Sequence, residues 1–332
     1  MDNEIYLVTG AAGHLGSTII RELLKQGKNI RAMVIPEEKN IPEGNLEIYV
    51  GDVCNKENLR GFFANPENKE LVVIHCAGIV SIASQEVPAV FKVNVNGTRN
   101  VVDLCEEYHI KKLVYVSTVH AIPEKKKGEI ITEIKDFNPD EVVGFYAKTK
   151  SEATAYVLAA ARRGLNASVV HPSGISGPYD NGNGHLTTLV IDYCKNRLVA
   201  GIKGGYDFVD VRDVAVGIIA CCNKGKPGEG YILSNKYFTV PEILSMLHEI
   251  TGKREIKTIL PLWLAQLTAP LAELYYKILR QTPLYTAYSI YTLNSNAQFS
   301  HEKATIELGY TTRDMRQTLG DTVDWLKKKG RL

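Results

Sequence analysis

The chain has 332 residues, of which 45% are hydrophobic and 23% charged, and its formal net charge at pH 7 is +2. This composition is ordinary for a globular protein with a large core, and the balanced charges give no reason to expect nucleic acid as a partner. The six cysteines show neither CxxC spacing nor a disulfide framework, so we expect reduced thiols, a cytoplasmic setting and no metal site. We also expect no secretory leader and no transmembrane segment, because the first residues enter a strand at once and no apolar run is long enough to span a membrane.

The first 170 residues alternate between strand-like and helix-like patterns. Longer amphipathic stretches typical of helices, such as 17–26 and 90–108, separate several short β-branched runs. Continuous apolar strands separated by helices indicate a parallel sheet that is covered on both faces. The pattern therefore predicts an α/β fold in which residues 1–172 form a doubly wound domain of the Rossmann type. The predicted strands are Ile5–Thr9, Ile30–Val34, Leu46–Val50, Leu71–His75, Leu113–Ser117 and Ala167–His171.

After about residue 172 this alternation breaks down. Loops rich in Gly and Asn come first, at 177–184 and 201–205, and helical patterns follow at 240–250, 262–279 and 314–328. We predict that residues 173–332 form mainly a smaller substrate-binding lobe, interwoven with the sheet rather than independent of it. We also expect later segments, including about 206–222, to complete the sheet.

The sequence TGAAGHLG, residues 9–16, follows the first strand directly and leads into an amphipathic helix. Gly10 would permit a tight turn, Gly13 a close approach of the backbone to a pyrophosphate, and Gly16 close packing of the helix on the strand. The start of the helix offers unpaired N–H groups and positive dipole potential to phosphates. A plain turn is the alternative, but the position between strand and helix favours dinucleotide binding.

Two other strand ends carry candidate cofactor contacts. Asp52, in the sequence GDV at 51–53, is suited either to accept a hydrogen bond from an adenine amino group or to cap the following helix, and the sequence leaves both open. The run HCAG, at 75–78, ends the fourth strand with small residues. That suits close passage of a cofactor or a tight strand exit.

A Tyr–Lys pair lies in a helical stretch that runs to Gly164: Tyr146 and Lys150 are four residues apart and therefore share one face of the helix. A cationic lysine near a phenol favours the phenolate and lowers the tyrosine pKa from about 10. Such a tyrosine can pass a proton to or from a substrate oxygen. The same spacing also occurs at Tyr108 and Lys112, to which we assign no role. The spacing alone therefore does not identify a catalytic pair, and the surrounding motifs must do so.

The ordered set of motifs resembles the extended branch of the short-chain dehydrogenase/reductase superfamily, the NAD-dependent epimerase/dehydratase family. In character it is most similar to dihydroflavonol reductase-like and 3β-hydroxysteroid dehydrogenase-like members. The motifs that carry the resemblance are TGAAGHLG (9–16), GD (51–52), HCAG (75–78), NVNGT (94–98), YVSTV (115–119), YAKTK (146–150) and HPSGISGP (171–178).

The resemblance implies specific roles. Tyr146 would donate or accept the proton, and Lys150 would lower the pKa of its hydroxyl. Thr118, or else Ser117, would hold the substrate oxygen. Asn94 would support the site. The implied cofactor contacts are Gly10, Ala12, Gly13, His14, Leu15, Gly16, Asp52, Val53, Ala77, Gly78, Tyr146, Lys150, His171, Pro172 and Ser173.

The end of the second predicted strand bears on the choice between NAD and NADP. Dihydroflavonol-reductase-like sequences often have Arg where this chain has Ile35, and Glu37 and Glu38 would repel a 2′-phosphate. Lys39 or Arg31 would compensate if the loop brings them close. The residues favour NAD slightly and leave NADP open.

We therefore expect a dehydrogenase or reductase that acts on a secondary alcohol or ketone, bound between Tyr146, the loop 120–143 and the second lobe. A nucleotide-sugar epimerase or dehydratase is the alternative, with Arg197 and Arg212 as the candidates to hold a diphosphate. A dinucleotide-binding regulator is the third hypothesis. The apolar segment 260–276 and the tyrosines at 285, 288 and 291 suit an apolar substrate or the core of the lobe. The resemblance also allows a homodimer.

Overall fold

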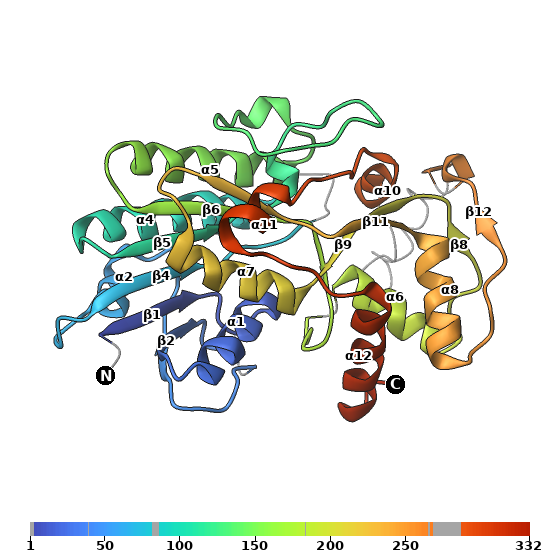
Figure 1. Ribbon diagram of the computed structural model, residues 1–332, viewed down its shortest axis with the longest axis horizontal. Helices are drawn as coiled ribbons and strands as arrows, with labels where there is room; N and C mark the ends of the chain where they lie inside the picture. Colours follow the sequence, from blue (N-terminus) through green and yellow to red (C-terminus); the bar gives the residue numbers. More distant parts are fainter. Residues whose placement is uncertain (1–2, 39, 82–85, 183, 265, 268–286) are drawn as a thin grey trace.

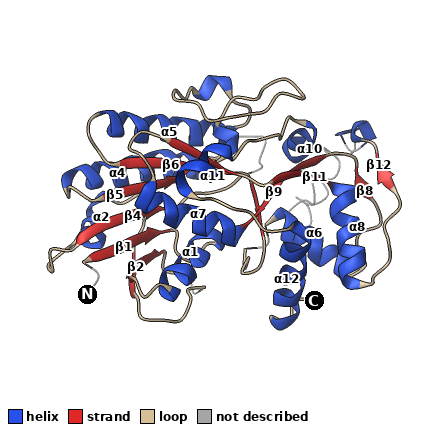
Figure 2. Cartoon of the chain, in the orientation of Figure 1, coloured by secondary structure: helices blue, strands red, loops and turns tan. Residues whose placement is uncertain are grey.

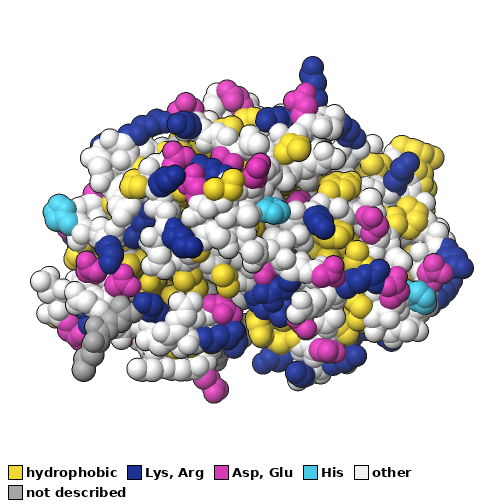
Figure 3. Space-filling view, viewed as in Figure 1, with side chains coloured by type: hydrophobic (Ala, Val, Ile, Leu, Met, Phe, Trp, Pro, Cys, Tyr) yellow, Lys and Arg dark blue, Asp and Glu magenta, His cyan; other side chains and the backbone are white. Residues whose placement is uncertain are grey.

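The computed structural model describes all residues except 1–2, 39, 82–85, 183, 265 and 268–286. An α/β half, which contains the N-terminal strands, lies beside a smaller half built from later segments (Figure 1). Two strands, β9 (Gly205–Asp210) and β11 (Lys236–Thr239), run along the junction of the two halves, and the last helix, α12 (Met315–Lys328), belongs to the smaller one. Side chains of both charges are interspersed over the face drawn in Figure 3.

The larger half is built on a seven-stranded sheet in which every neighbouring pair is parallel. Its strand order is β10-β6-β5-β4-β1-β2-β3, the doubly wound order with one added strand. All six predicted strands are confirmed to within one residue at either end. These six strands are β1 (Glu4–Thr9), β2 (Asn29–Val34), β3 (Glu47–Val50), β4 (Glu70–His75), β5 (Lys112–Val116) and β6 (Ala167–Pro172), and the seventh strand of the sheet, which was not predicted, is β10 (Gly230–Leu233).

The helices cover both faces of this sheet, as Figure 2 shows. Successive residues of a strand point to opposite faces, so Leu7 packs into one core while Tyr6 and Val8 pack into the other. The first face is covered by α2 (Lys56–Phe63), α4 (Thr98–Glu107) and α5 (Phe145–Arg162). The second is covered by α1 (His14–Lys25), α7 (Val211–Lys224) and α11 (Glu302–Leu308).

The prediction for residues 206–222 is wrong in one respect. The strand in this segment, β9, does not join the main sheet; it pairs with β7 (Gly174–Ser176) and β11 in a separate three-stranded sheet. The reason is that the chain leaves the main sheet after β6 and continues at once into β7, which takes β9 as its parallel partner. The short strand β10 completes the main sheet instead, and α7 covers it.

The smaller half packs three helices, α6 (His185–Cys194), α8 (Val240–Thr251) and α12, around its own apolar cluster. The sequence defines α8 sharply, because Thr239 and Glu242 form a reciprocal capping box at its start and Gly252 ends it with a φ of 65°. Within the part of the chain that the structure describes, it also contains β8 (Gly201–Ile202), β12 (Ile259–Leu260) and α10 (Ala287–Asn294).

Several short elements lie between the main strands and helices. They are α3 (Pro88–Phe91), the π-helical turn η1 (Lys92–Gly97) and the 3₁₀ turns η2 (Val119–Ala121) and η3 (Pro139–Glu141). Two of them, η1 and η2, carry residues that matter for the site.

Most of the apolar segment predicted as a helix at 262–279 lies outside the described residues, as does Tyr285, and the side chain of Tyr288 is not described either. Within the described part, Leu262 packs with Ile290, whereas Trp263 and Leu267 are exposed. Among the described residues, no helix combines the length and apolar character needed to cross a membrane.

Candidate active site

The loop between β1 and α1 has the shape that its glycines predict. Gly10 has a φ of 65°, and a Cβ there would lie 2.8 Å from the backbone of Ala77. A Cβ on Gly16 would lie 2.1 Å from the carbonyl oxygen of Gly10, so the helix can lie this close to the turn only because residue 16 has no side chain. Helix α1 begins after Gly13 with no side-chain cap, so its N-terminus suits an anion. These three glycines form a cradle that fits the pyrophosphate of a dinucleotide.

The other residues of the cradle divide between core packing and contact with the second half. Ala12 and Leu15 are half-buried against the core under α1. The imidazole Nε2 of His14 lies 2.9 Å from the carbonyl oxygen of Pro178 in the loop that follows β7. Burial lowers the pKa of His14, so at neutral pH its uncharged ring donates this hydrogen bond. The predicted cradle residue thus links the two halves.

Asp52 lies exposed just after β3, and its Oδ1 accepts a hydrogen bond from the backbone N–H of Cys54 at 2.9 Å. The cap of the following helix is Asn55, so the alternative reading of Asp52 as that helix cap is wrong. Val53 is buried and packs tightly against Gly97, where a Cβ would come within 2.6 Å of the valine side chain.

The residues at the end of β2 are now placed, apart from Lys39, which lies outside the described residues. The carboxylate of Glu38 accepts a hydrogen bond from the backbone N–H of Ile35 at 3.2 Å. Arg31 does not reach this loop, because its guanidinium pairs with Glu47 at 2.7 Å and also donates to backbone carbonyls. Among the described residues of this loop, the carboxylate of Glu38 is therefore the charged group that lies against the residue following β2.

The Tyr–Lys pair lies at the start of α5, with Tyr146 in its first turn and Lys150 one turn later. Lys150 is 5% exposed, and its Nζ donates to the carbonyl oxygen of Val116 at 2.6 Å. The ammonium also lies 4.4 Å from the centre of the Tyr115 ring. Burial lowers the pKa of Lys150 to about 7, so its charge responds to partners that arrive at the site.

The two candidate hydroxyls at the end of β5 have different partners. Ser117 is turned toward α5, where its Oγ lies 2.7 Å from Oγ1 of Thr154. Thr118 caps η2, and its Oγ1 accepts from the backbone N–H of His120 at 3.3 Å. Thr118 thus begins the segment after β5 that contains η2, whereas the Ser117 hydroxyl is engaged in a hydrogen bond with α5.

Asn94 lies in the π-helical turn η1, a geometry that recurs at functional sites. It is fully buried, and its amide both accepts from the N–H of Ile79 at 2.8 Å and donates to the carbonyl oxygen of Ile79 at 3.1 Å. The same amide donates to Thr149 of α5 at 3.2 Å. Asn94 therefore ties the strand exit after β4 to the helix that carries Tyr146.

A buried histidine, His75, supports the end of β4. Its two ring nitrogens lie 2.7 Å from the hydroxyl of Thr9 and 3.0 Å from that of Thr98. The Thr9 hydroxyl also accepts from the N–H of Ala77. Beyond it, a Cβ on Gly78 would lie 3.2 Å from Asn94 Oδ1, so the backbone passes close to the site. The small residues at 76–78 thus follow a strand end that is held rigidly.

The predicted contacts at the end of β6 are buried within the protein. His171 is 1% exposed, its ring stacks on that of Phe137 with centroids 5.3 Å apart, and burial lowers its pKa to about 4. Pro172 ends β6. The Ser173 hydroxyl donates to Asp207 Oδ1 at 2.5 Å. Sequence reasoning missed Asp207, whose side chain is buried and whose other oxygen has no partner among the described residues.

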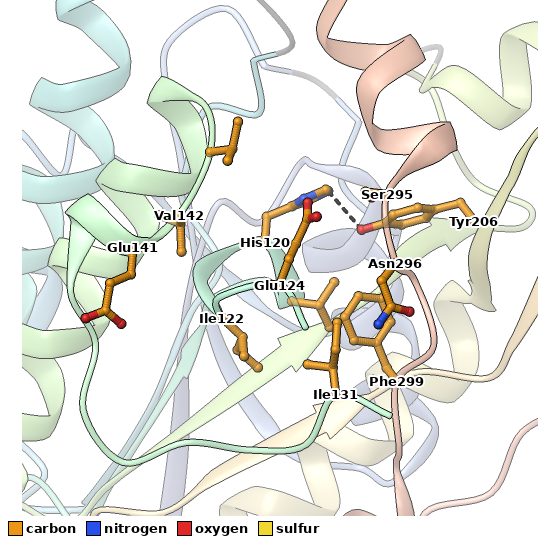
Figure 4. Close-up of a pocket in the computed structure, with 12 residues that line it drawn as sticks. His120, Ile122, Glu124, Ile131, Glu141, Val142, Tyr206, Ser295, Asn296 and Phe299 are labelled. Carbon is orange, nitrogen blue, oxygen red and sulfur yellow. Dashed lines mark hydrogen bonds between the residues drawn. The ribbon is translucent and has the colours of Figure 1, made fainter. Parts of the chain in front are cut away.

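A pocket of about 110 Å³ lies between the loop after β5 and the smaller half (Figure 4). Its described lining contains two glutamates, Glu124 and Glu141, and neither lysine nor arginine. The Glu141 side chain turns away from the other labelled side chains, whereas His120 and Tyr206 point toward each other. The lining residues are Val119, His120, Ile122, Glu124, Ile131, Glu141, Val142, Val143, Tyr206, Ser295, Asn296 and Phe299.

The two arginines considered for a diphosphate do not line this pocket. Arg212 is engaged on two sides, by Asp210 at 2.7 Å and Asp321 at 2.6 Å. Arg197 is 65% exposed and lies 3.8 Å from Asp192. The structure therefore supplies no diphosphate clamp from these two positions.

The chain has a doubly wound sheet with a glycine cradle after β1, and a Tyr–Lys pair one turn apart lies on the covering helix. These features define an enzyme of the extended short-chain type that works with a nicotinamide dinucleotide. The chain belongs to the NAD-dependent epimerase/dehydratase family, whose sequence profile matches residues 6–234.

Individual relatives match almost the whole chain. Sterol demethylase protein B of Methylococcus capsulatus is 29% identical over 98% of both chains. The 3 beta-hydroxysteroid dehydrogenase type 7 of Rattus norvegicus is 27% identical over 97% of this chain and 95% of its own. Among solved structures, gox2253 matches with a TM-score of 0.85 and 28% identity over 99% of both chains. A UDP-glucose 4-epimerase of Thermus thermophilus, solved in complex with NAD, matches with a TM-score of 0.77 and 23% identity over 97% of this chain and 99% of that one.

Proposed function

We propose that this enzyme transfers hydride between a nicotinamide dinucleotide and a secondary alcohol or ketone of mainly apolar character. The observation that carries the proposal is the position of Tyr146. It lies one turn from the buried Lys150 and edge-on to His120 of the pocket, with ring centroids 6.5 Å apart.

The residues of the chain divide the work around the reacting oxygen. The bound cofactor supplies or receives the hydride. Tyr146 gives a proton to the substrate oxygen or takes one from it, and the Lys150 cation favours the phenolate form during that exchange. Thr118 holds the same oxygen by a hydrogen bond. Asn94 keeps the strand exit and α5 in register, so the three groups meet the substrate in a fixed arrangement.

The pocket supports an apolar, uncharged substrate rather than a sugar nucleotide. Its described lining is mostly aliphatic and aromatic, and its two charged members are carboxylates, which repel a diphosphate. The names of two relatives, a sterol demethylase protein and a 3 beta-hydroxysteroid dehydrogenase, refer to apolar fused-ring molecules. We therefore extend that substrate class to this chain.

We further propose NAD as the preferred cofactor. The carboxylate of Glu38 lies against the backbone N–H of Ile35, the first residue after β2, where a ribose hydroxyl would be bound and a 2′-phosphate repelled. Arg31 is committed to Glu47. The NAD found with the structural relative is consistent with this choice.

The Tyr146→Phe variant tests the reaction. We expect a loss of turnover of about 100-fold or more, because the proton carrier is gone, while the Kd for NAD stays within about two-fold. The matched control is Tyr108→Phe, which alters the second Tyr–Lys motif, where the hydroxyl donates to the backbone carbonyl oxygen of Arg60 at 3.5 Å. Turnover of Tyr146→Phe equal to that of the control would refute the mechanism. Conversion of a UDP-sugar without net change in nicotinamide absorbance would favour the epimerase alternative.

A further inference from the structure

Two stretches of chain that are far apart in the sequence line the pocket together and are bonded to each other. The first, residues 124–131, is a loop that follows η2, and we call it the loop wall. The second, residues 291–300, runs from α10 toward α11. The lining residues that they contribute are Glu124, Ile131, Ser295, Asn296 and Phe299 (Figure 4).

The loop wall is folded into a tight turn that presents its carbonyl groups to one side chain. The backbone N–H of Glu129 donates to the carbonyl oxygen of Lys126 at 3.0 Å, and Gly128 has a φ of 91°, which suits the third residue of a type II turn. Three carbonyl oxygens of this loop accept hydrogen bonds from Nδ2 of Asn296, at 3.3, 2.9 and 2.8 Å. They belong to Lys125, Lys126 and Glu129, respectively.

The amide of Asn296 is buried, and its orientation is fixed from both ends. The residue is 7% exposed, and its Oδ1 accepts a hydrogen bond from the backbone N–H of Gln298 at 3.2 Å. The amide nitrogen therefore faces the loop carbonyls, which need a donor. The turn is thus held by hydrogen bonds that come from the pocket side of the loop rather than from solvent.

Other contacts hold the two ends of the loop wall. At one end, Ile131 donates its N–H to the carbonyl oxygen of Gln298 at 2.8 Å and accepts from the N–H of Ser300 at 2.9 Å. At the other end, Glu124 accepts a hydrogen bond from the Tyr291 hydroxyl at 2.8 Å. These contacts do not involve the buried amide. Its replacement therefore releases the turn and leaves the ends of the loop attached.

We propose that Asn296 is a positioning residue for substrate binding, which holds the turn of the loop wall in place beside an apolar ketone or alcohol in the pocket. The inference rests on the proposed function and deepens it. Substrate binding requires the fixed turn, so the apparent affinity falls in proportion to the fraction of molecules in which the turn is fixed. The complex that forms is the same in every case, and the chemical step keeps its rate.

The Asn296→Ala variant tests this with 2-decalone, an uncharged fused-ring ketone. We expect KM to rise about ten-fold and kcat to stay within about two-fold, because the lost hydrogen bonds stabilise the fixed turn by roughly that factor. Asn296→Asp keeps the shape of the side chain but turns an oxygen toward the loop carbonyls, so KM should rise at least as much. The matched control is Asn294→Ala, which removes an exposed side chain that accepts from Lys127 of the same loop at 3.0 Å. It should keep the wild-type KM.

Trypsin measures the release of the turn without any turnover. The loop wall contains three exposed lysines, at 125–127, and a protease cleaves such a site in proportion to the population in which the loop leaves its fixed conformation. With NAD alone, cleavage at these lysines should be about ten-fold faster in Asn296→Ala than in wild type or in Asn294→Ala. Saturating 2-decalone should slow it toward the wild-type rate. Mass spectrometry of the fragments identifies the site, and unchanged cleavage elsewhere separates release of the turn from global unfolding.

The outcomes distinguish this assignment from the proposed reaction. An unchanged KM in Asn296→Ala, or a fall in kcat without a rise in KM, would overturn the assignment and leave hydride transfer intact. Faster cleavage that the ketone does not slow would also overturn it. If neither protein turns the ketone over, calorimetric Kd values on the NAD-bound protein replace KM. A Kd about ten-fold weaker in Asn296→Ala, together with protection by the ketone, would support the assignment and count against the proposed reaction.

Discussion

Two regions on either side of the proposed substrate position are held together in different ways. On the catalytic face, formed by Asn94, Ser117, Lys150 and Thr154, polar side chains are linked by hydrogen bonds of 2.6–3.2 Å. On the lobe interface, formed by His120, Tyr206, Phe208 and Phe299, ring packing dominates, and the one side-chain hydrogen bond within this group joins His120 to Tyr206.

The difference separates chemistry from selectivity. Hydrogen bonds fix atoms to within a few tenths of an ångström, as a proton transfer requires. Ring contacts accept more variation in geometry, because their energy depends mainly on buried area and approximate orientation. Substitutions on the catalytic face should therefore change rate and stability, whereas substitutions at the lobe interface should change which substrate is used.

The largest effect is expected on the catalytic face from Lys150→Met. It keeps the aliphatic stem but removes the cation that favours the phenolate, so kcat should fall about 100-fold or more. Lys148→Met, two residues away on the same helix, removes an exposed lysine that lies 3.7 Å from Asp140 and should keep the wild-type rate. Steady-state kinetics on purified variants check this. A rate for Lys150→Met within about ten-fold of the control would show that the cation is dispensable.

A smaller effect, on stability, is expected from Asn94→Ala. The substitution removes a fully buried amide that pairs with both the N–H and the carbonyl of Ile79, so the free energy of unfolding should fall by about 2–3 kcal/mol. Urea denaturation measures the change. Asn100→Ala is the control, because that half-buried side chain makes one bond, to the carbonyl oxygen of Val53, and should lose about 1 kcal/mol or less. Equal losses would mean that Asn94 does not tie strand to helix.

The smallest effect concerns the buried carboxyl beside the lobe interface. Burial raises the pKa of Asp207 to about 6, so the folded chain keeps a proton between about pH 4 and pH 6 that the unfolded chain releases. The free energy of unfolding therefore falls as pH rises through this window and stays lower above it. The Asp207→Asn variant still accepts a hydrogen bond from Ser173 but does not titrate. Its free energy of unfolding relative to wild type should therefore be about 1–2 kcal/mol higher at pH 7.5 than at pH 5.

Urea denaturation at the two pH values measures that gain. Glu242→Gln serves as the control, since hydrogen bonds from the backbone and side chain of Thr239 lower the pKa of Glu242. Glu242 is therefore ionised in both the folded and the unfolded chain above about pH 5, and the stability of Glu242→Gln relative to wild type should stay nearly constant over the same interval. If Asp207→Asn shows no dependence on pH, the carboxyl is ionised throughout.

The strands of the main sheet and the start of the site could be predicted from the sequence because their signals are local. Apolar β-branched runs between helices define six strands, and Gly10, Gly13 and Gly16 fall within eight residues of one another. The strand β10 was missed because it lies in the later half of the chain, where strands and helices no longer alternate and no pattern assigns its four residues to the main sheet. The partners of Tyr206 and Asp207 were missed because they come from segments 34–86 residues away, and spacing along the chain contains no information about such contacts.

The hydrogen bond from His14 to the carbonyl oxygen of Pro178 couples the phosphate cradle to the smaller half of the molecule. It joins the phosphate cradle to the loop that leads into the smaller half. A change in the position of one segment therefore changes the free energy of the other. If a bound dinucleotide stabilises this contact, a contact that is already formed strengthens dinucleotide binding by the same free energy, because such coupling is reciprocal. The loop also holds Tyr179 under the guanidinium of Arg21, 4.6 Å from the ring centre, which gives α1 a second connection to it. Cofactor occupancy and the placement of the smaller half are therefore linked variables: whatever fixes one of them also favours the other.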